Sequence, residues 1–113
     1  MESILNSVKK MLGITEDYDH FDKDIIMHIN SVFLNLTQIG VGPEEGFFIE
    51  DDITEWTDFI GDVAQLQAVK SYMYLKVKLL FDPPLNGAVM ESTNRQIAEL
   101  EWRLRLAAEM LSE

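Results

Sequence analysis

Apolar side chains recur every three or four residues along most of the chain, a spacing that places them on one face of an α-helix. Four stretches follow this pattern, namely residues 3–12, 22–39, 62–80 and 89–111. A helical segment of one or two turns is also expected at residues 53–59, and no stretch has a convincing strand pattern. The pattern predicts an all-α fold, a small helical bundle of four main helices plus one short helix.

Glycine and proline residues mark the ends of these predicted helices. Gly13 and Gly40 follow the first two stretches, where glycine can adopt the left-handed conformation that ends a helix. Residues 40–52 begin with three glycines and a proline within seven positions, which predicts a long loop between the second helix and the short helix. The segment FDPPLNG at residues 81–87 prevents further helix and predicts a stiff elbow before the last helix.

The third stretch contains a local pattern that resembles a strand, because residues 75–79 alternate apolar and basic side chains. The longer stripe from Leu66 to Leu80 has the helical period, and a second apolar stripe runs beside it. A helix that is apolar on two sides usually lies between neighbours. We therefore expect this helix at the centre of the bundle.

Polar side chains predict how some helices begin and pair. Asp62 and Gln65 form a D-x-x-Q arrangement related to the capping box, and Asp19 and Asp22 are N-cap candidates for the second helix. Two ion pairs are expected across one turn of the last helix, Glu99 with Arg103 and Glu101 with Arg105.

The charge of the chain is strongly negative and unevenly distributed. The 113 residues carry a net charge of −11, with 14 acids and three lysines in residues 1–62 and six acids and six bases in residues 63–113. A protein of this charge does not wrap nucleic acid, which requires clustered lysine and arginine. The division suggests an acidic surface on one side and a balanced, packable segment on the other.

Length and composition limit the remaining classes. The chain suits one domain, residues 1–113, and its lack of cysteine excludes disulfides and thiolate metal sites. The first residues lack the pattern of a signal peptide, and no apolar run is long enough to span a membrane, so no membrane partner is expected.

The sequence offers no active site, metal site or cofactor site. The segment GVGPEEG lacks the Lys-Ser/Thr ending of a phosphate loop, and the acidic cluster Glu50–Asp52 lacks the ligand spacing of a calcium loop. His20 and His28 do not form a zinc-binding pattern. We therefore expect no enzymatic activity and no cofactor.

Candidate interface residues fall into three groups. The aromatic residues of the loop and short helix either fill the core or anchor an interface, where aromatic side chains carry much of the binding energy. The loop acids and the lysines of the third stretch are either solvated or meet oppositely charged neighbours. The candidates are Phe47, Phe48 and Trp56; Glu44, Glu45, Glu50, Asp51 and Asp52; and Lys70, Lys76 and Lys78.

Four segments, taken together, resemble one known family over residues 10–106. They are HFDKDIIMHINSVFLNLTQIGVGPEEGFFI, WTDFIGD, YMYLKVKLLFDPP and QIAELEWRL. The sequence is similar to the head–tail connector (adaptor) proteins of long-tailed bacteriophages and of prophages in Gram-positive hosts.

This resemblance implies a structural virion protein without enzymatic activity. It implies a small all-α chain, made in the cytoplasm of the bacterial host, that forms a homo-oligomeric ring under the portal protein at the head–tail interface. The ring would extend the DNA channel, which DNA crosses without specific binding, and would give a stopper or tail-completion protein a docking surface.

The charge pattern adds two hypotheses to this implication. Acidic residues that face the channel would repel the phosphates of DNA, and residues 40–53 with the end of the last helix would contact the portal ring. The alternative function is a small acidic helical binding module, such as a DNA-mimic inhibitor or regulator. The acids cluster in links and caps rather than at phosphate-like spacing, which favours the adaptor.

Overall fold

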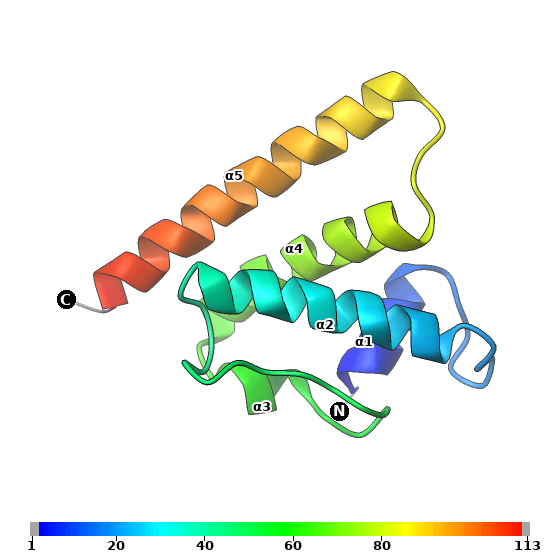
Figure 1. Ribbon diagram of the computed structural model, residues 1–113, viewed down its shortest axis with the longest axis horizontal. Helices are drawn as coiled ribbons and strands as arrows, with labels where there is room; N and C mark the ends of the chain where they lie inside the picture. Colours follow the sequence, from blue (N-terminus) through cyan, green and yellow to red (C-terminus); the bar gives the residue numbers. More distant parts are fainter. Residues whose placement is uncertain (1–2, 112–113) are drawn as a thin grey trace.

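Five helices form in the order that the hydrophobic pattern predicts, as a computed structural model of the chain shows (Figure 1). They are α1 (Ile4–Met11), α2 (Asp22–Gln38), α3 (Trp56–Phe59), α4 (Val63–Phe81) and α5 (Gly87–Leu111). The structure describes residues 3–111, and within that range the only β-type pairing is an isolated bridge between Ser3 and Glu55. The prediction of an all-α fold with four main helices and one short helix is confirmed.

Most helix ends follow from the residues that the sequence marks. The Ser3 hydroxyl accepts a hydrogen bond from the Asn6 backbone N–H at 3.1 Å at the start of α1, and Gly13 has φ +81° just after its end. At the start of α4, the Asp62 carboxylate accepts from the Gln65 backbone N–H at 3.1 Å, as the D-x-x-Q arrangement predicts.

The predicted caps of α2 are wrong. Phe21 occupies the N-cap position without a side-chain hydrogen bond, and Asp22 is the first residue of the helix. Asp22 and Asp24 instead lie in the first turn, where their negative charge interacts favourably with the helix dipole.

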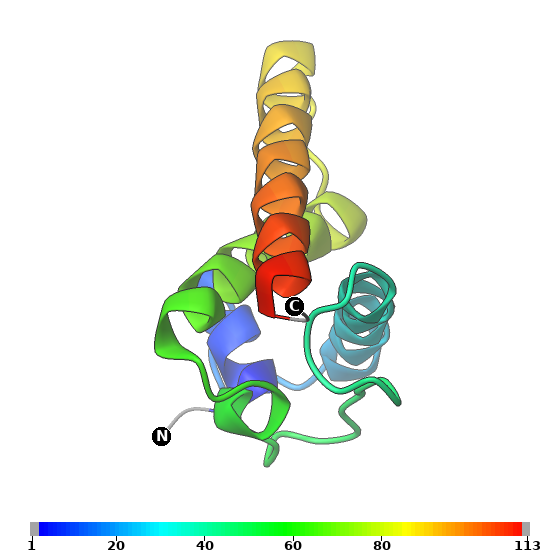
Figure 2. The same cartoon turned by 90° about the vertical axis from the view of Figure 1, so that its left-hand side faces the viewer.

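The elbow between α4 and α5 forms where the two prolines predict it. Pro83 and Pro84 cannot continue α4, and the Asn86 side chain starts α5 by accepting hydrogen bonds from the Ala88 and Val89 backbone N–H groups at 2.8 and 3.3 Å. The chain thereby reverses, and α5 runs back along α4 with its N-terminal end rising away from the other helices (Figures 1 and 2).

Helix α4 lies at the centre, as predicted, because it packs against α1, α2 and α5. The core consists of its buried side chains and the facing residues of the other helices, among them Leu5, Val8, Ile25, Ile29, Val32, Phe33, Leu36, Val69, Tyr72, Met73, Val77, Ile97 and Leu104. None of the described helices combines the length and the apolar character that crossing a membrane requires.

The predicted apolar stripe of α4 is wrong in its last turn. Leu80 is exposed, and Phe81 takes its place against the core by packing edge-on against Phe21 with ring centroids 5.3 Å apart. The stripe therefore steps by four residues from Val77 to Phe81, not by three.

A buried lysine joins α1 to α2. The Lys9 side chain is 1% exposed, and its Nζ lies 2.9 Å from Asp22 Oδ1 and donates a hydrogen bond to the Glu16 carbonyl at 2.9 Å. Asp22 Oδ1 is buried and makes no hydrogen bond of good geometry among the described residues, so the ion pair compensates its burial. The sequence pattern placed Lys9 only near the end of α1.

A buried tyrosine joins α4 to α5. The Tyr72 hydroxyl donates a hydrogen bond to Glu101 Oε2 at 2.7 Å, and Lys76 Nζ lies 3.8 Å from the same oxygen. The predicted pair of Glu99 with Arg103 is confirmed at 2.8 Å. The predicted pair of Glu101 with Arg105 is wrong, because Glu101 turns to α4 instead.

We expect Tyr72→Phe to lower the free energy of unfolding by about 1–2 kcal/mol, since it leaves a partly buried carboxylate with one partner fewer. Burial first, and then the hydrogen bond and negative charge of Glu101, raise the pKa of Tyr72. Because the folded-state pKa is raised, the stability of the unaltered protein should decline above pH ~10, the usual tyrosine pKa. Denaturant unfolding at pH 7 and above pH 10 checks both points. The free energy of unfolding should fall less between these pH values in Tyr72→Phe than in the unaltered protein. An equal fall in the two proteins would contradict the assignment.

Candidate assembly interface

The loop between α2 and α3 is held against the helices at its beginning. The Val41 backbone N–H donates to the Leu36 carbonyl at 2.9 Å, and the Val41 side chain is buried. Gly42, with φ +86°, lies directly against the Phe59 ring, where a side chain would have no room. The start of this long loop is therefore a packed part of the fold.

The second attachment of the loop is a pair of hydrogen bonds from one side chain. The Asn30 amide donates to the Ile49 carbonyl at 3.0 Å, and its oxygen accepts from the Ile49 backbone N–H at 2.8 Å. Ile49 itself is buried under α2. The Asn30 side chain thus pairs with both backbone polar groups of Ile49, as the backbone of a neighbouring β-strand would.

We expect Asn30→Ala to lower the free energy of unfolding by about 1–2 kcal/mol and to loosen residues 46–53, because both polar groups of the Ile49 backbone lose their partner. Amide hydrogen exchange is the measurement, and faster exchange of the Ile49 N–H with α4 unchanged is the expected result. Ser31→Ala is a suitable control, since the Ser31 hydroxyl bonds only to the Met27 carbonyl within α2.

The aromatic candidates divide into core residues and one exposed residue. Phe47 packs against Phe33 and Phe59 with centroids 5.0 and 5.2 Å away, and Trp56 is buried beside the same cluster. The next loop residue, Phe48, is 65% exposed. Of the two adjacent loop phenylalanines, only Phe48 is available to another molecule.

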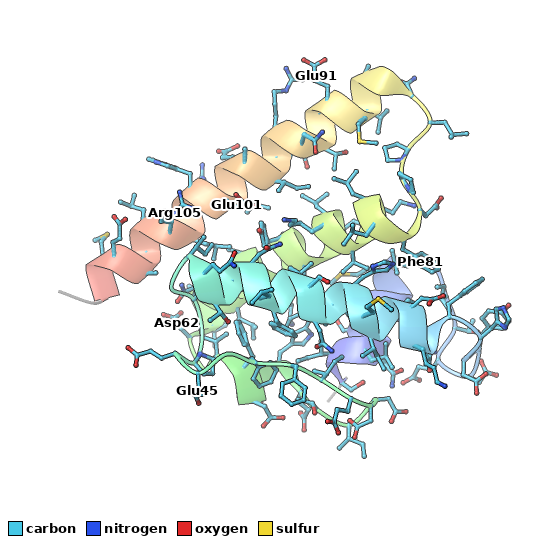
Figure 3. The ribbon with its side chains drawn as sticks, in the orientation of Figure 1. Glu45, Asp62, Phe81, Glu91, Glu101 and Arg105 are labelled. Carbon is cyan, nitrogen blue, oxygen red and sulfur yellow. The ribbon has the colours of Figure 1, made fainter. Side chains whose placement is uncertain are left out.

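The acidic candidates all lie on the surface of the loop. Glu44 and Glu45 occupy the turn closed by the hydrogen bond from the Gly46 N–H to the Pro43 carbonyl, and Figure 3 places Glu45 at the outer edge. On either side of buried Ile49 the chain exposes a mixed segment, which we name the loop tip. It comprises residues 48–53, in which exposed Phe48 and Ile53 flank the exposed acids Glu50, Asp51 and Asp52.

The lysine candidates lie along α4, and each has a contact within the chain. Lys70 Nζ lies 5.8 Å from the centre of the Trp56 ring, Lys76 lies by Tyr72 and Glu101, and Lys78 pairs with Asp82 at 3.0 Å. Exposed pairs of this kind contribute little to stability and exchange partners readily. Among the described residues, none of these lysines forms an ion pair with an acid of the loop.

A groove between α4 and α5 is the feature that sequence reasoning missed. It has a volume of about 410 Å³ and is lined by Asp62, Ala64, Gln65, Ala68, Arg103, Leu104, Ala107 and Met110. The signal in the sequence is the pair of alanines one turn apart at the start of α4, since small side chains let a neighbouring helix leave open space. We name this feature the α4–α5 groove.

Next to this groove, α5 carries an apolar edge that the rest of residues 3–111 leaves uncovered. Trp102, Leu106 and Met110 follow one another at intervals of one turn and are all exposed. Among residues 3–111, no group of three or more histidine, cysteine or acidic side chains is arranged to hold a metal ion.

A helical fold with exposed apolar and acidic surfaces is typical of a protein that acts by joining other proteins. A family model described as "Phage connector protein" matches residues 4–110, and the chain belongs to this family. A search of curated proteins and a search of solved structures each gave no significant match.

Family membership establishes the general role. The protein is a phage head–tail connector, from a family of structural virion proteins, and the family implies contacts with portal and tail proteins in the virion. The resemblance carried by the loop, the short helix and the elbow is thereby confirmed at the level of the family.

Proposed function

We propose that this connector assembles as a closed ring of identical subunits beneath the portal protein and prolongs the DNA channel toward the tail. The opposite side of the ring then provides the docking surface for a stopper or tail-completion protein. Residues 1–113 act in this proposal as one connector domain without a cofactor.

The observation that best supports the ring is the presence of two unlike surfaces on one chain. The loop tip is acidic with exposed apolar residues, whereas the α4–α5 groove is apolar with an arginine at its edge. Rings form through heterologous contacts, in which one surface of each subunit meets a different surface of the next. A chain with one self-complementary patch would favour a twofold dimer instead.

The net charge of −11 supports free passage of DNA through this ring. Acidic side chains on a channel wall repel phosphates, so that DNA crosses without being held. Two exposed groups of acids are available for such a wall. They are the pair Glu44 and Glu45 and the acids of the link between α1 and α2. The lysines of α4 then serve contacts between proteins.

The direct test is to mix the purified chain with its cognate portal protein and to image the complex by electron microscopy. We expect an additional ring of density on one end of the portal, coaxial with its channel. Portal particles without added density over a range of salt concentrations would contradict the proposal. A tail protein unable to bind the portal should bind this two-ring complex.

A further inference from the structure

We infer that the loop tip of one subunit docks in the α4–α5 groove of the next, so that this pair of surfaces is the subunit contact of the ring. The inference rests on the proposed ring and identifies which parts of each copy meet. Its central contact is Phe48 entering the groove beside Ala64, Ala68 and Ala107.

The two surfaces match in apolar character. The groove walls carry three alanines together with Leu104 and Met110, and its volume of about 410 Å³ has room for a phenyl ring. Phe48 is 65% exposed and Ile53 74%, the two apolar side chains that the loop tip presents. Burial of an exposed phenylalanine in such a pocket removes apolar surface from water and so favours association.

The two surfaces also match in charge. Arg103 lies on the α5 wall of the groove, and its partner among the described residues is Glu99, an exposed neighbour one turn away. The loop tip carries Glu50, Asp51 and Asp52 beside Phe48. In the proposed contact, their carboxylates meet Arg103 when the phenyl side chain of Phe48 enters the groove. Asp62 on the α4 wall repels them, which directs the acids toward α5.

The positions of the two surfaces suit head-to-tail association. Figure 1 shows the loop leaving α2 near the C-terminal end of α5, running beneath α2 away from that end, and turning back to α3. The groove lies at that C-terminal end, because Arg103, Ala107 and Met110 line it. The turn of the loop lies away from that end of its own chain, and docking between copies leaves one free groove and one free tip for further subunits.

The absence of cysteine in the sequence allows a direct cross-linking test. In the double variant Glu50→Cys/Ala64→Cys, a short bis-maleimide should join neighbouring subunits on the portal into a ladder of covalent oligomers. The control Glu50→Cys/Ala98→Cys places the second thiol on an exposed position of α5 outside the groove and should give no ladder.

The outcomes separate this inference from the proposed function. A ring on the portal that yields no ladder, or equal ladders in the two variants, overturns the docking inference and leaves the proposed function intact. A failure of the unaltered chain to add a ring overturns both.

A second variant tests the apolar contact without cross-linking. Phe48→Ser should raise the concentration needed for ring assembly on the portal at least about tenfold, as expected for the loss of an interface anchor. Met27→Ser is the matched control, because Met27 is also an exposed apolar residue but lies on α2. Assembly of Phe48→Ser at the concentration of the unaltered chain, with both variants equally folded by circular dichroism, overturns the inference.

Discussion

Replacement of Gly42 by alanine is expected to lower the free energy of unfolding by about 3 kcal/mol. Gly42 has φ +86°, and an added Cβ would lie 2.6 Å from Cζ of Phe59 and closer still to its Cε1. Phe59 is buried against Phe33 and Phe47, so its ring has little room to move. The substitution therefore combines backbone strain with a steric clash in the core.

Thermal unfolding followed by circular dichroism measures this effect, and we expect a fall in Tm of roughly 10 °C or more. Gly46→Ala is the matched control, since Gly46 has φ +94° in the same loop and nothing within 4 Å of an added Cβ. That variant should show the backbone strain alone, about 1 kcal/mol. Equal losses in the two variants would show that the contact with Phe59 is not what requires glycine at position 42.

Lys9→Ala is expected to lower the free energy of unfolding by about 2–3 kcal/mol. The change removes the charge that compensates Asp22 Oδ1, removes the hydrogen bond to the Glu16 carbonyl, and leaves space where the buried stem packed. Because the Asp22 side chain is 26% exposed, water relieves part of the penalty, and the cost stays below that of a fully buried pair.

Urea unfolding of five chains separates these contributions: the unaltered protein, Lys9→Ala, Lys9→Met, Asp22→Asn and the double variant Lys9→Met/Asp22→Asn. Lys9→Met keeps an apolar stem and should lose less than Lys9→Ala. The double variant should be more stable than the sum of the single losses predicts, because neither change then leaves a charge unpaired. If the losses of the two single variants simply add, the 2.9 Å contact between Lys9 Nζ and Asp22 Oδ1 contributes nothing to stability. As a control, Lys23→Ala should leave the free energy of unfolding almost unchanged, because Lys23 is exposed.

The sequence was sufficient for the helices because their boundaries depend on nearby residues. The Asp62 cap, the glycine after α1 and the Asn86 start of α5 each involve partners within a few positions. The local alternation at residues 75–79 was correctly outweighed by the longer helical period of α4.

Contacts between distant segments were not predictable in the same way. Lys9 is buried because α2 and the link before it bring Asp22 and Glu16 to it, and no periodicity in α1 reports this. Glu101 meets Tyr72 only because α5 turns back on α4. Likewise, the adjacent residues Phe47 and Phe48 have identical side chains, and only the folded chain shows that Phe47 packs in the core while Phe48 is exposed.

The sequence singled out the loop half of the candidate site and, of the other half, only the end of the last helix. Loop acids and aromatic residues are visible in the sequence as a cluster, whereas the α4–α5 groove is formed by small side chains on two helices that meet after the elbow. Alanine side chains are neutral and small, so their pattern in the sequence does not indicate a binding surface. The space that they leave exists only in the folded chain.

The central position of α4 has a geometric consequence for a closed ring. The groove belongs to α4 and α5, while the loop tip is attached to α2, so the angle between the two surfaces is set by the packing of α2 on α4. In a ring, a small angular error in each copy accumulates around the circle and leaves a gap or an overlap at the last subunit. The interior of α4 contains neither glycine nor proline, so the helix is stiff and keeps the angle between the two surfaces constant. Core substitutions beneath α2 would accordingly alter the number of subunits that close the ring before they alter the strength of any one contact.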